Sequence, residues 1–296
     1  MTERALADAY AMCRRVAHRA GPNFSVGFRF LPKHKRNGVY AAYAFCRFVD
    51  DVVDETPGAG VVERIDHWEE ELDRCYEGRP TREVTVALAD TVSRYLIPKS
   101  AFAGLIEGCR QDLVKNRYAS FDELMGYSDL VATTIATMSL SIFGYDDVAA
   151  IPRGRDLATA FQLTNILRDV GDDIAKDRIY LPADEMARFG VSEDDLKAGR
   201  VTPQFEELMR FQVERVREHY HRAEVLLDLI EPDCRRCTCL MGAVYYEVLN
   251  HIEDQGFAVF GRRIGLSSVE KLGLVMRTYL AKSPTWVNMG SVRSAT

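Results

Sequence analysis

Apolar residues recur at intervals of three and four along nearly every long segment of the chain. The clearest series are Val39, Tyr43, Cys46, Val49 and Val53, and Phe205, Met209, Val213 and Val216. Such spacing is typical of amphipathic α-helices, whereas runs that alternate with a period of two, as strands do, are not found. The pattern predicts an all-α protein with roughly ten helices separated at Gly and Pro positions.

The breaks between these segments are short, and none is a long linker rich in Pro, Gly or Ser. Composition does not change between the two halves of the 296 residues, and no internal repeat is evident. We therefore expect a single domain over residues 1–296, a length that can bury a large core. Residues 1–20 and 283–296 are expected to be peripheral to it.

Charge and hydropathy exclude two classes of protein. The net charge is −6 and no basic stripe with interleaved aromatic residues is present, so we expect no nucleic-acid partner. The longest apolar stretches, such as 131–143, fall short of the roughly 20 residues of a membrane span. The first residues lack the pattern of a secretory signal, so a cytoplasmic protein is expected.

Seven cysteines are present, and four of them lie singly in helical patterns. The other three, Cys234, Cys237 and Cys239, could supply zinc ligands together with His219 and His221. Their spacing lacks a second paired half and lies within a helical pattern, so reduced, buried thiols are the preferred interpretation.

A first acidic motif lies in the segment RFVDDVVDE, residues 47–55. Asp50 and Asp54 are four residues apart, which places both carboxylates on one face of the expected helix. Like charges at this spacing destabilise a helix by a few tenths of a kcal/mol unless a cation compensates them.

A second acidic motif lies in the segment QLTNILRDVGDD, residues 162–173, where Asp169 and Asp173 are again four apart. One such pair alone is most often a solvated helix face. Here both pairs are surrounded by apolar residues, which indicates that the carboxylates face an interior cavity. Carboxylate oxygens suit Mg²⁺, whose coordination is commonly completed by substrate phosphates. The two motifs therefore predict helices that face each other and hold Mg²⁺ with a diphosphate.

Loss of a diphosphate would leave an allylic carbocation, which requires a pocket poor in water. Aromatic side chains can stabilise such a cation through their π faces. The candidates for this lining are Phe24, Phe28, Tyr43, Phe45, Tyr127 and Tyr245. For most of them taken alone, a place in the ordinary core is the better interpretation.

Beyond these motifs, the sequence resembles the squalene/phytoene synthase family of trans-isoprenyl diphosphate synthases from about residue 24 to residue 271. The most specific stretch is NILRDVGDD followed by DRIYLP, residues 165–173 and 177–182. The matching stretches also include residues 43–55, 112–118, 127–132 and 245–271. The resemblance implies a single-domain, all-α isoprenoid synthase bundle with a central apolar cavity.

The resemblance also implies roles for individual residues. Asp50, Asp54, Asp169 and Asp173 would bind metal, with help from Asn165. Arg47, Arg168, Arg178 and Arg263 would bind diphosphate. The reaction centre would be lined by Tyr127, Gln162, Tyr180 and Tyr245.

In this family two identical prenyl diphosphates, farnesyl or geranylgeranyl, condense head to head through a cyclopropylcarbinyl diphosphate. The product expected from the resemblance is a hydrocarbon of the phytoene, squalene or dehydrosqualene type. Mg²⁺ is the implied cofactor, and NADPH is needed only where the product is squalene. Association with a membrane surface would suit so apolar a product, although no strongly amphipathic basic helix indicates it. Chain length and oligomeric state stay open.

Two departures from the family pattern bear on the substrate. Gly21-Pro22-Asn23 replaces a Ser-Lys-Ser type stretch that helps to hold diphosphate. Val131 and Ala132 of the central helix match the pattern, but Thr133 and Ala136 replace two glycines, which would narrow the space for substrate.

This narrowing supports an alternative function, in which one prenyl group is transferred to an aromatic acceptor. A third reading, a helical protein without catalysis, is disfavoured because all four aspartates are retained.

Overall fold

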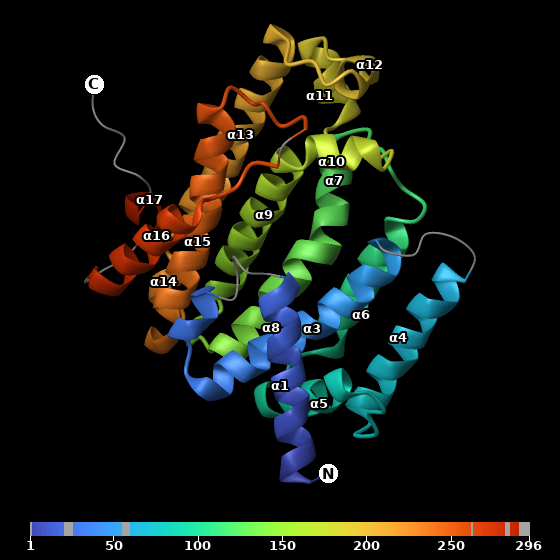
Figure 1. Ribbon diagram of the computed structural model, residues 1–296, viewed down its shortest axis with the longest axis vertical. Coiled ribbons are helices and arrows are strands. Elements are labelled where there is room, and N and C mark those ends of the chain that lie inside the picture. The colour runs from blue at the N-terminus through green and yellow to red at the C-terminus, as the bar shows by residue number, and fades with distance from the viewer. Residues whose placement is uncertain (1, 21–25, 55–59, 262, 282–284, 290–296) are drawn as a thin grey trace. The chain divides into compact units, whose positions relative to one another are not determined.

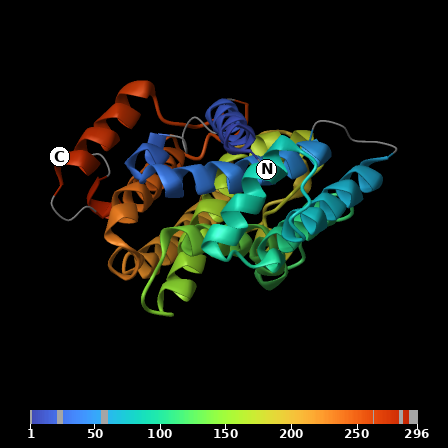
Figure 2. The ribbon, with the colours of Figure 1, turned by 90° about the horizontal axis from the view of Figure 1, so that it is seen from below.

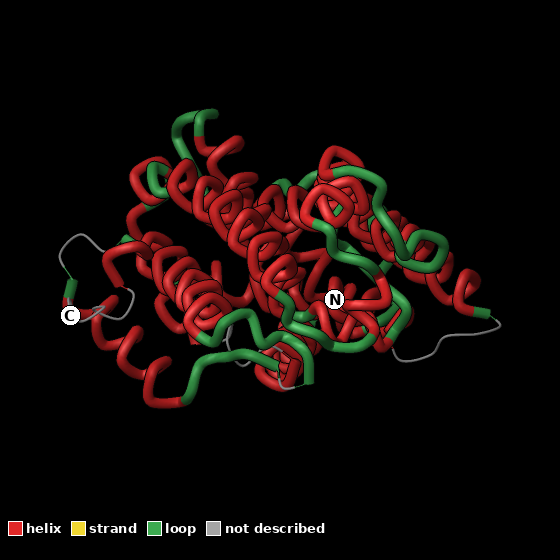
Figure 3. The backbone as a smooth tube through the Cα atoms, turned by 90° about the horizontal axis from the view of Figure 1, so that it is seen from above, coloured by secondary structure: helices red, strands yellow, loops and turns green. Residues whose placement is uncertain are grey.

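The computed structural model describes residues 2–20, 26–54, 60–261, 263–281 and 285–289. Helices and their connecting loops make up this part of the chain, and no strand occurs among the described residues (Figure 3). Two isolated bridges, between Arg117 and Ile179 and between Tyr145 and Ile230, are the only β-type pairings in it. The all-α prediction is confirmed, although the helices are more numerous and shorter than expected.

The chain divides into two compact units, which we describe separately. The first comprises residues 1–114, 133–151 and 228–237, and the second comprises residues 115–132, 152–227 and 238–296. A single domain over the whole chain stays a prediction.

The first unit is built around α3, which packs against α1, α5, α6 and α8. One face of α3 carries Tyr40, Ala44, Phe45 and Val49, all buried, in agreement with the predicted helical periodicity. The helices of this unit, labelled in Figure 1, are α1 (Glu3–Ala20), the short 3₁₀-helix η1 (Phe28–Phe30), α3 (Lys33–Asp54), α4 (Val61–Tyr76), α5 (Glu83–Tyr95), α6 (Lys99–Gln111) and α8 (Thr134–Phe143).

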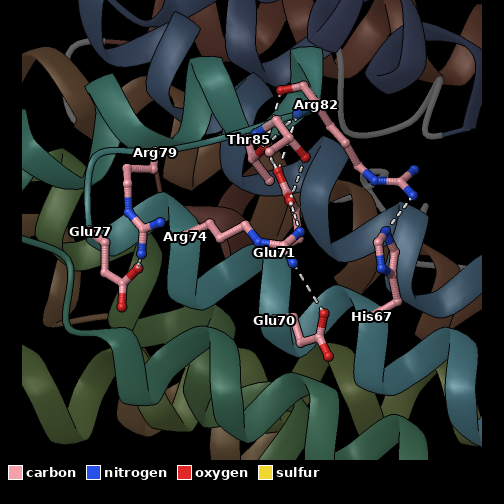
Figure 4. A network of polar contacts seen from close by, with 9 residues as sticks. His67, Glu70, Glu71, Arg74, Glu77, Arg79, Arg82 and Thr85 are labelled. Atoms are coloured by element: carbon pink, nitrogen blue, oxygen red, sulfur yellow. Dashed lines mark hydrogen bonds and ion pairs between the residues drawn. The ribbon is translucent and has the colours of Figure 1, made fainter.

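A fully buried carboxylate, Glu71, ties α4 to the start of α5 in the first unit (Figure 4). It accepts hydrogen bonds from the backbone N–H of Thr81 (2.7 Å) and Arg82 (3.1 Å) and from the hydroxyls of Thr81 (2.7 Å) and Thr85 (2.6 Å). Burial by itself raises the pKa of Glu71, but these donors outweigh it and lower the pKa to about 2. Glu71 therefore stays ionised and closes the turn between the two helices.

The second unit contains the long helices α9, α13 and α15 and the C-terminal elements. The remaining helices are α7 (Phe121–Ser128), the π-helical segment η2 (Asp129–Thr133), α9 (Ala150–Arg168), α10 (Val170–Ala175), α11 (Ala183–Phe189), α12 (Glu193–Lys197), α13 (Pro203–Ala223), α14 (Leu226–Leu229), α15 (Pro232–Asp254), α16 (Ser268–Leu280) and α17 (Trp286–Met289). The unit boundaries cut η2, α9, α14 and α15, so the first residues of α9 and α15 belong to the first unit.

The expectation of peripheral ends needs correction. Within the first unit α1 packs on α3 and α5 and buries Cys13 and Ala17. Within the second unit Trp286 is fully buried and donates its indole N–H to the carbonyl of Tyr220 (3.3 Å). A Cβ atom at Gly242 would lie 2.6 Å from the Trp286 ring, so this glycine makes room for the indole. Both ends thus contribute to a core.

Candidate active site

The first acidic motif occupies the last turn and a half of α3. Asp50 lies on this helix with half of its side chain exposed, and Arg47 lies 3.4 Å from its carboxylate. Arg47 also pairs with Asp51, four residues later. Asp54 is the last residue of α3, as the predicted spacing requires. The described part of the motif is thus a regular helix end, on which the side chains of Asp50 and Asp51 are 52% and 28% exposed.

The second acidic motif differs from the prediction, because the helix is interrupted at Asp169. This residue lies between α9 and α10 with φ −99° and ψ 11°. Two backbone hydrogen bonds still continue through the break, from the N–H of Asp169 to the carbonyl of Asn165 and from the N–H of Asp173 to the carbonyl of Asp169, each 2.8 Å. Asn165, Asp169 and Asp173 therefore follow one another at one-turn intervals, as on a continuous helix.

Gly171 sets the position of this turn in the second unit. A Cβ atom there would lie 2.7 Å from the carbonyl oxygen of Val259 and 3.1 Å from the Cα of Phe260. Only glycine permits this approach, which brings α10 against the segment that leads to Arg263.

Asp169 is held by two guanidinium groups. Arg263 donates through Nε and Nη2 to both of its oxygens, each at 2.9 Å, and Arg168 donates from Nε at 2.7 Å and from Nη2. Burial raises the pKa of Asp169, but the two arginines outweigh it and lower the pKa below its ordinary value. Two cations thus bind one carboxylate. Arg168 is adjacent to Asp169 in the chain, whereas Arg263 is 94 positions away.

The pKa of Asp173 is displaced in the opposite direction to that of Asp169. Burial raises its pKa and the charge of Asp169 raises it further, while Arg178 and Lys176 oppose this only in part, so that the pKa reaches about 7. The amide oxygen of Asn165 is also buried and accepts a hydrogen bond from none of the described residues. A cation beside these three side chains would satisfy the buried oxygen and let both carboxylates ionise, so the donor set fits Mg²⁺.

Asp173 and Arg178 line a small, partly open depression in the second unit. Its walls are apolar, from Ile166, Val170, Ile174, Ile179 and Leu181, with Tyr180 completing them. The ring of Tyr180 stacks on those of Tyr118 and Tyr127, with centroids 5.6 Å apart in both pairs, and the rings of Tyr118 and Tyr127 are tilted at 45° with centroids 5.5 Å apart. Tyr127 and Tyr180, predicted from separate motifs, thus come together.

Arg117 fixes the loop that carries Arg178 and Tyr180. Its guanidinium donates to the carboxylate (2.8 Å) and carbonyl (2.6 Å) of Asp177, to the carbonyl of Asn116 (2.9 Å) and to both oxygens of Glu193 (2.8 and 3.1 Å). Asp177 has a positive φ of 56°, which this clamp stabilises.

Comparisons with known proteins agree with this geometry. The sequence model of the squalene/phytoene synthase family matches residues 17–270. The chain belongs to the squalene/phytoene synthase family.

Two curated relatives cover almost the whole chain. It is 37% identical over 279 residues to a phytoene synthase of Arthrospira platensis, with 90% of each chain covered. It is 35% identical to a 15-cis-phytoene synthase of Synechococcus elongatus, with 90% of this chain and 91% of the relative covered.

Solved structures give the same family. A dehydrosqualene synthase in complex with ligand matches with a TM-score of 0.88 at 28% identity, covering 93% of this chain and 97% of that one. A squalene synthase from Alicyclobacillus acidocaldarius matches with a TM-score of 0.81 at 32% identity, covering 86% and 97%. Squalene/phytoene synthases are prenyltransferases that condense prenyl diphosphates, and this chain is such an enzyme.

The other residues expected from the squalene/phytoene synthase resemblance take separate places. Tyr245 of α15 stacks on Phe161 of α9 (4.5 Å) and has Arg168 as a hydrogen-bond partner, which joins it to the Asp169 group. Gln162 is half-buried on α9, one turn before Asn165.

In the first unit, Phe28 is buried with its ring edge-on to Tyr40, and burial raises the pKa of Tyr43, which lies on α3 four residues before Arg47. Phe24 lies outside the described residues.

The central helix of the squalene/phytoene synthase pattern is not a continuous α-helix here. Val131 and Ala132 lie in η2 and in the second unit, whereas Thr133 and Ala136 fall in the first. The hydroxyl of Thr137 donates to the carbonyl of Thr133 (2.9 Å). Neither η2 nor its division between units has a signal in the residue spacing.

Sequence reasoning gave no role to Arg117 or Tyr118, although both stand in a stretch that resembles the squalene/phytoene synthase pattern. Spacing offers no signal for them, because their partners Asp177 and Tyr180 lie about 60 residues away.

Cys234, Cys237 and Cys239 are buried on α15 and form no disulfide with a described residue, and burial raises the pKa of Cys234 and Cys239 to about 12. None of the described helices is long and apolar enough to span a bilayer.

Proposed function

We propose that this enzyme catalyses the Mg²⁺-dependent, head-to-head condensation of two molecules of geranylgeranyl diphosphate to a hydrocarbon of the phytoene type. The names of its curated relatives support phytoene as the product class. They equally support a reaction without NADPH, since phytoene formation needs no reductant.

The observation that carries this proposal is the series Asn165, Asp169 and Asp173. An orphaned buried amide oxygen, a carboxylate held by two arginines and a carboxyl group with a pKa of about 7 follow one another at one-turn intervals. A purely structural site would have satisfied these groups internally. We infer that they hold Mg²⁺, with Asp50 and Asp54 as the ligands of the first motif.

The bound metal would supply Lewis-acid stabilisation of the charge that develops on the departing diphosphate. The arginines of the site would bind and orient that diphosphate, because a guanidinium group matches phosphate oxygens in a bidentate manner. Arg168, Arg178 and Arg263 take this role in the second unit, and Arg47 takes it on α3.

The aromatic residues would protect the carbocation that remains after ionisation. The stacked rings of Tyr118, Tyr127 and Tyr180 offer π faces beside an apolar depression, and such faces attract a cation by about 0.5–2 kcal/mol each. Tyr245, beside Arg168, is placed to orient the guanidinium, and Gln162 completes the proposed reaction centre.

The decisive experiment supplies the purified enzyme with geranylgeranyl or farnesyl diphosphate alone, with and without Mg²⁺ and NADPH. Products are identified by mass spectrometry, and Asp169→Asn serves as the control for background hydrolysis. We expect a forty-carbon hydrocarbon from geranylgeranyl diphosphate that requires Mg²⁺ and not NADPH. A thirty-carbon product would correct the chain length.

Diphosphate release without a hydrocarbon would contradict the proposal. A product formed only after an aromatic acceptor is added would identify the alternative, prenyl transfer to that acceptor.

A further inference from the structure

The outer face of α16 is apolar and exposed to solvent. Val269, Leu272, Met276, Tyr279 and Leu280 are exposed to 80%, 62%, 50%, 61% and 71%. At 100° per residue these five positions fall within a sector of about 100°, so they form one continuous stripe. The opposite side of the helix carries Leu274 and Thr278, which are fully buried.

Among the described residues, no other helix of the second unit covers this face. α16 packs beside α17 and lies at the margin of the second unit in both views (Figure 1, Figure 2). Single exposed apolar residues are common on soluble proteins, but five on one face of a 13-residue helix form a patch that indicates an interaction.

The charge around α16 is opposite to that of the rest of the chain. Residues 261–296 contain six Lys or Arg and a single acidic residue, Glu270, a net charge of +5 in a chain of net charge −6. Lys271 and Arg277 lie at half-buried positions on the two sides of the apolar stripe.

We propose that the apolar face of α16 docks on the surface of an anionic lipid bilayer. An amphipathic helix with an apolar stripe and flanking cations lies in the interface, with the stripe inserted roughly 5–10 Å and the cations at the lipid phosphates. The role of this docking rests on the proposed function: substrates with long apolar tails and a hydrocarbon product partition into the bilayer, and docking keeps the enzyme beside it.

The charge distribution favours a bilayer over a second copy of this chain. A two-fold contact through the same face would place the basic segments of both copies together, whereas an anionic surface compensates them.

The test is flotation of the purified enzyme, without substrate, with vesicles of phosphatidylcholine or of equal parts phosphatidylcholine and phosphatidylglycerol. The test variant is Leu272→Glu with Met276→Glu. The matched control is Val114→Glu with Val148→Glu, which changes the charge equally at residues of the first unit exposed to 86% and 74%.

We expect wild-type enzyme to bind the anionic vesicles more tightly than the neutral ones and less tightly at high salt. The α16 variant should lose about 10- to 100-fold in partition coefficient, because two inserted apolar side chains become charged, while the control loses less than about 3-fold. Circular dichroism and thermal unfolding check that both variants fold.

Equal binding by the two variants, or no binding by the wild-type enzyme, would overturn the docking surface. Self-association of the wild-type enzyme in light scattering, abolished in the α16 variant, would replace the bilayer by a second copy. These readouts need no turnover, so they fail independently of the proposed function.

Discussion

Two carboxyl groups withdrawn from solvent, Glu71 in the first unit and Asp173 in the second, have pKa values displaced in opposite directions. Burial alone would raise the pKa of both. At Glu71 four hydrogen-bond donors, three from the turn before α5 and one from its first turn, outweigh burial and lower the pKa to about 2 (Figure 4). At Asp173 the neighbouring charge of Asp169 adds to burial and the pKa is about 7.

The difference separates a carboxylate that serves the fold from one that, under the proposed function, serves a ligand. The protein itself supplies the donors that Glu71 needs, so its charge is stable in the chain alone. Asp173 experiences the like charge of Asp169, and the buried amide oxygen of Asn165, one turn before Asp169, accepts a hydrogen bond from no described residue. Under the proposed function a bound Mg²⁺ completes this group. Substitutions at the two positions should therefore have opposite consequences for stability and for turnover.

The largest expected effect is on turnover at the second position. Asp173→Asn should lower kcat by about 10²–10³-fold, because it removes a proposed ligand of the metal that stabilises the departing diphosphate. The free energy of unfolding without metal should be unchanged or higher, since a buried charge beside Asp169 is removed. Product formation and urea unfolding measure the two effects. Full activity, or a large loss of stability, would assign Asp173 to the fold.

Glu71→Gln should show the reverse pattern. The amide nitrogen would face donors, so we expect the free energy of unfolding to fall by about 2–4 kcal/mol with kcat unchanged. Glu70→Gln is the matched control on the same helix, because Glu70 is 64% exposed and only pairs with Arg74 at 3.3 Å. This control should cost less than about 1 kcal/mol. A stability loss equal to that of the control would contradict the role of the Glu71 network.

The sequence predicted the helices and the aspartate pairs of the site, but not the contacts between distant residues. The helical period located α3 and α9, and the four-residue spacing located both aspartate pairs. Spacing could show neither that the helix breaks at Asp169 nor that Gly171 closely approaches Val259, because residues about 90 positions apart have no fixed relation in the helical period. Nor could it show the pairing of Arg263 with Asp169, which is a contact between residues 94 positions apart.

Glu71 and the α16 stripe escaped sequence reasoning for a different reason. Glu71 is the last of three consecutive glutamates, and residue type alone does not distinguish this buried carboxylate from Glu69, which is half-buried, or Glu70, which is exposed. The apolar residues of α16 have the same period as those of any core-facing helix, and only the fold shows that its stripe points outward. Periodicity locates a face but does not show what covers it.

The effect of Mg²⁺ on the free energy of unfolding should distinguish Asp173 from Glu71. Saturating Mg²⁺ should raise the free energy of unfolding of the wild-type enzyme by about 1–3 kcal/mol, because an ion that binds only the folded state stabilises it. Asp173→Asn should lose most of this gain, whereas Glu71→Gln should keep all of it from its lower starting value. This gain is measured by thermal unfolding with Mg²⁺ and with EDTA. Ca²⁺ serves as the control for ionic strength. A gain that persists in Asp173→Asn would place the ion elsewhere.

The smallest effect concerns pH and tests the Glu71 network without a ligand. Its pKa is lowered in the folded state, so its contribution to stability is present above the unfolded pKa of about 4.3 and is lost as the pH falls toward 2. Once protonated, Glu71 resembles the glutamine of Glu71→Gln. In both cases a hydrogen-bond donor, the carboxyl O–H or the amide N–H, then faces the donors of Thr81, Arg82 and Thr85. The unfolding free energies of wild type and variant should thus differ most at neutral pH and converge between pH 4 and pH 2. A difference that stays constant across this range would mean that packing, and not the charge of Glu71, holds α4 to α5.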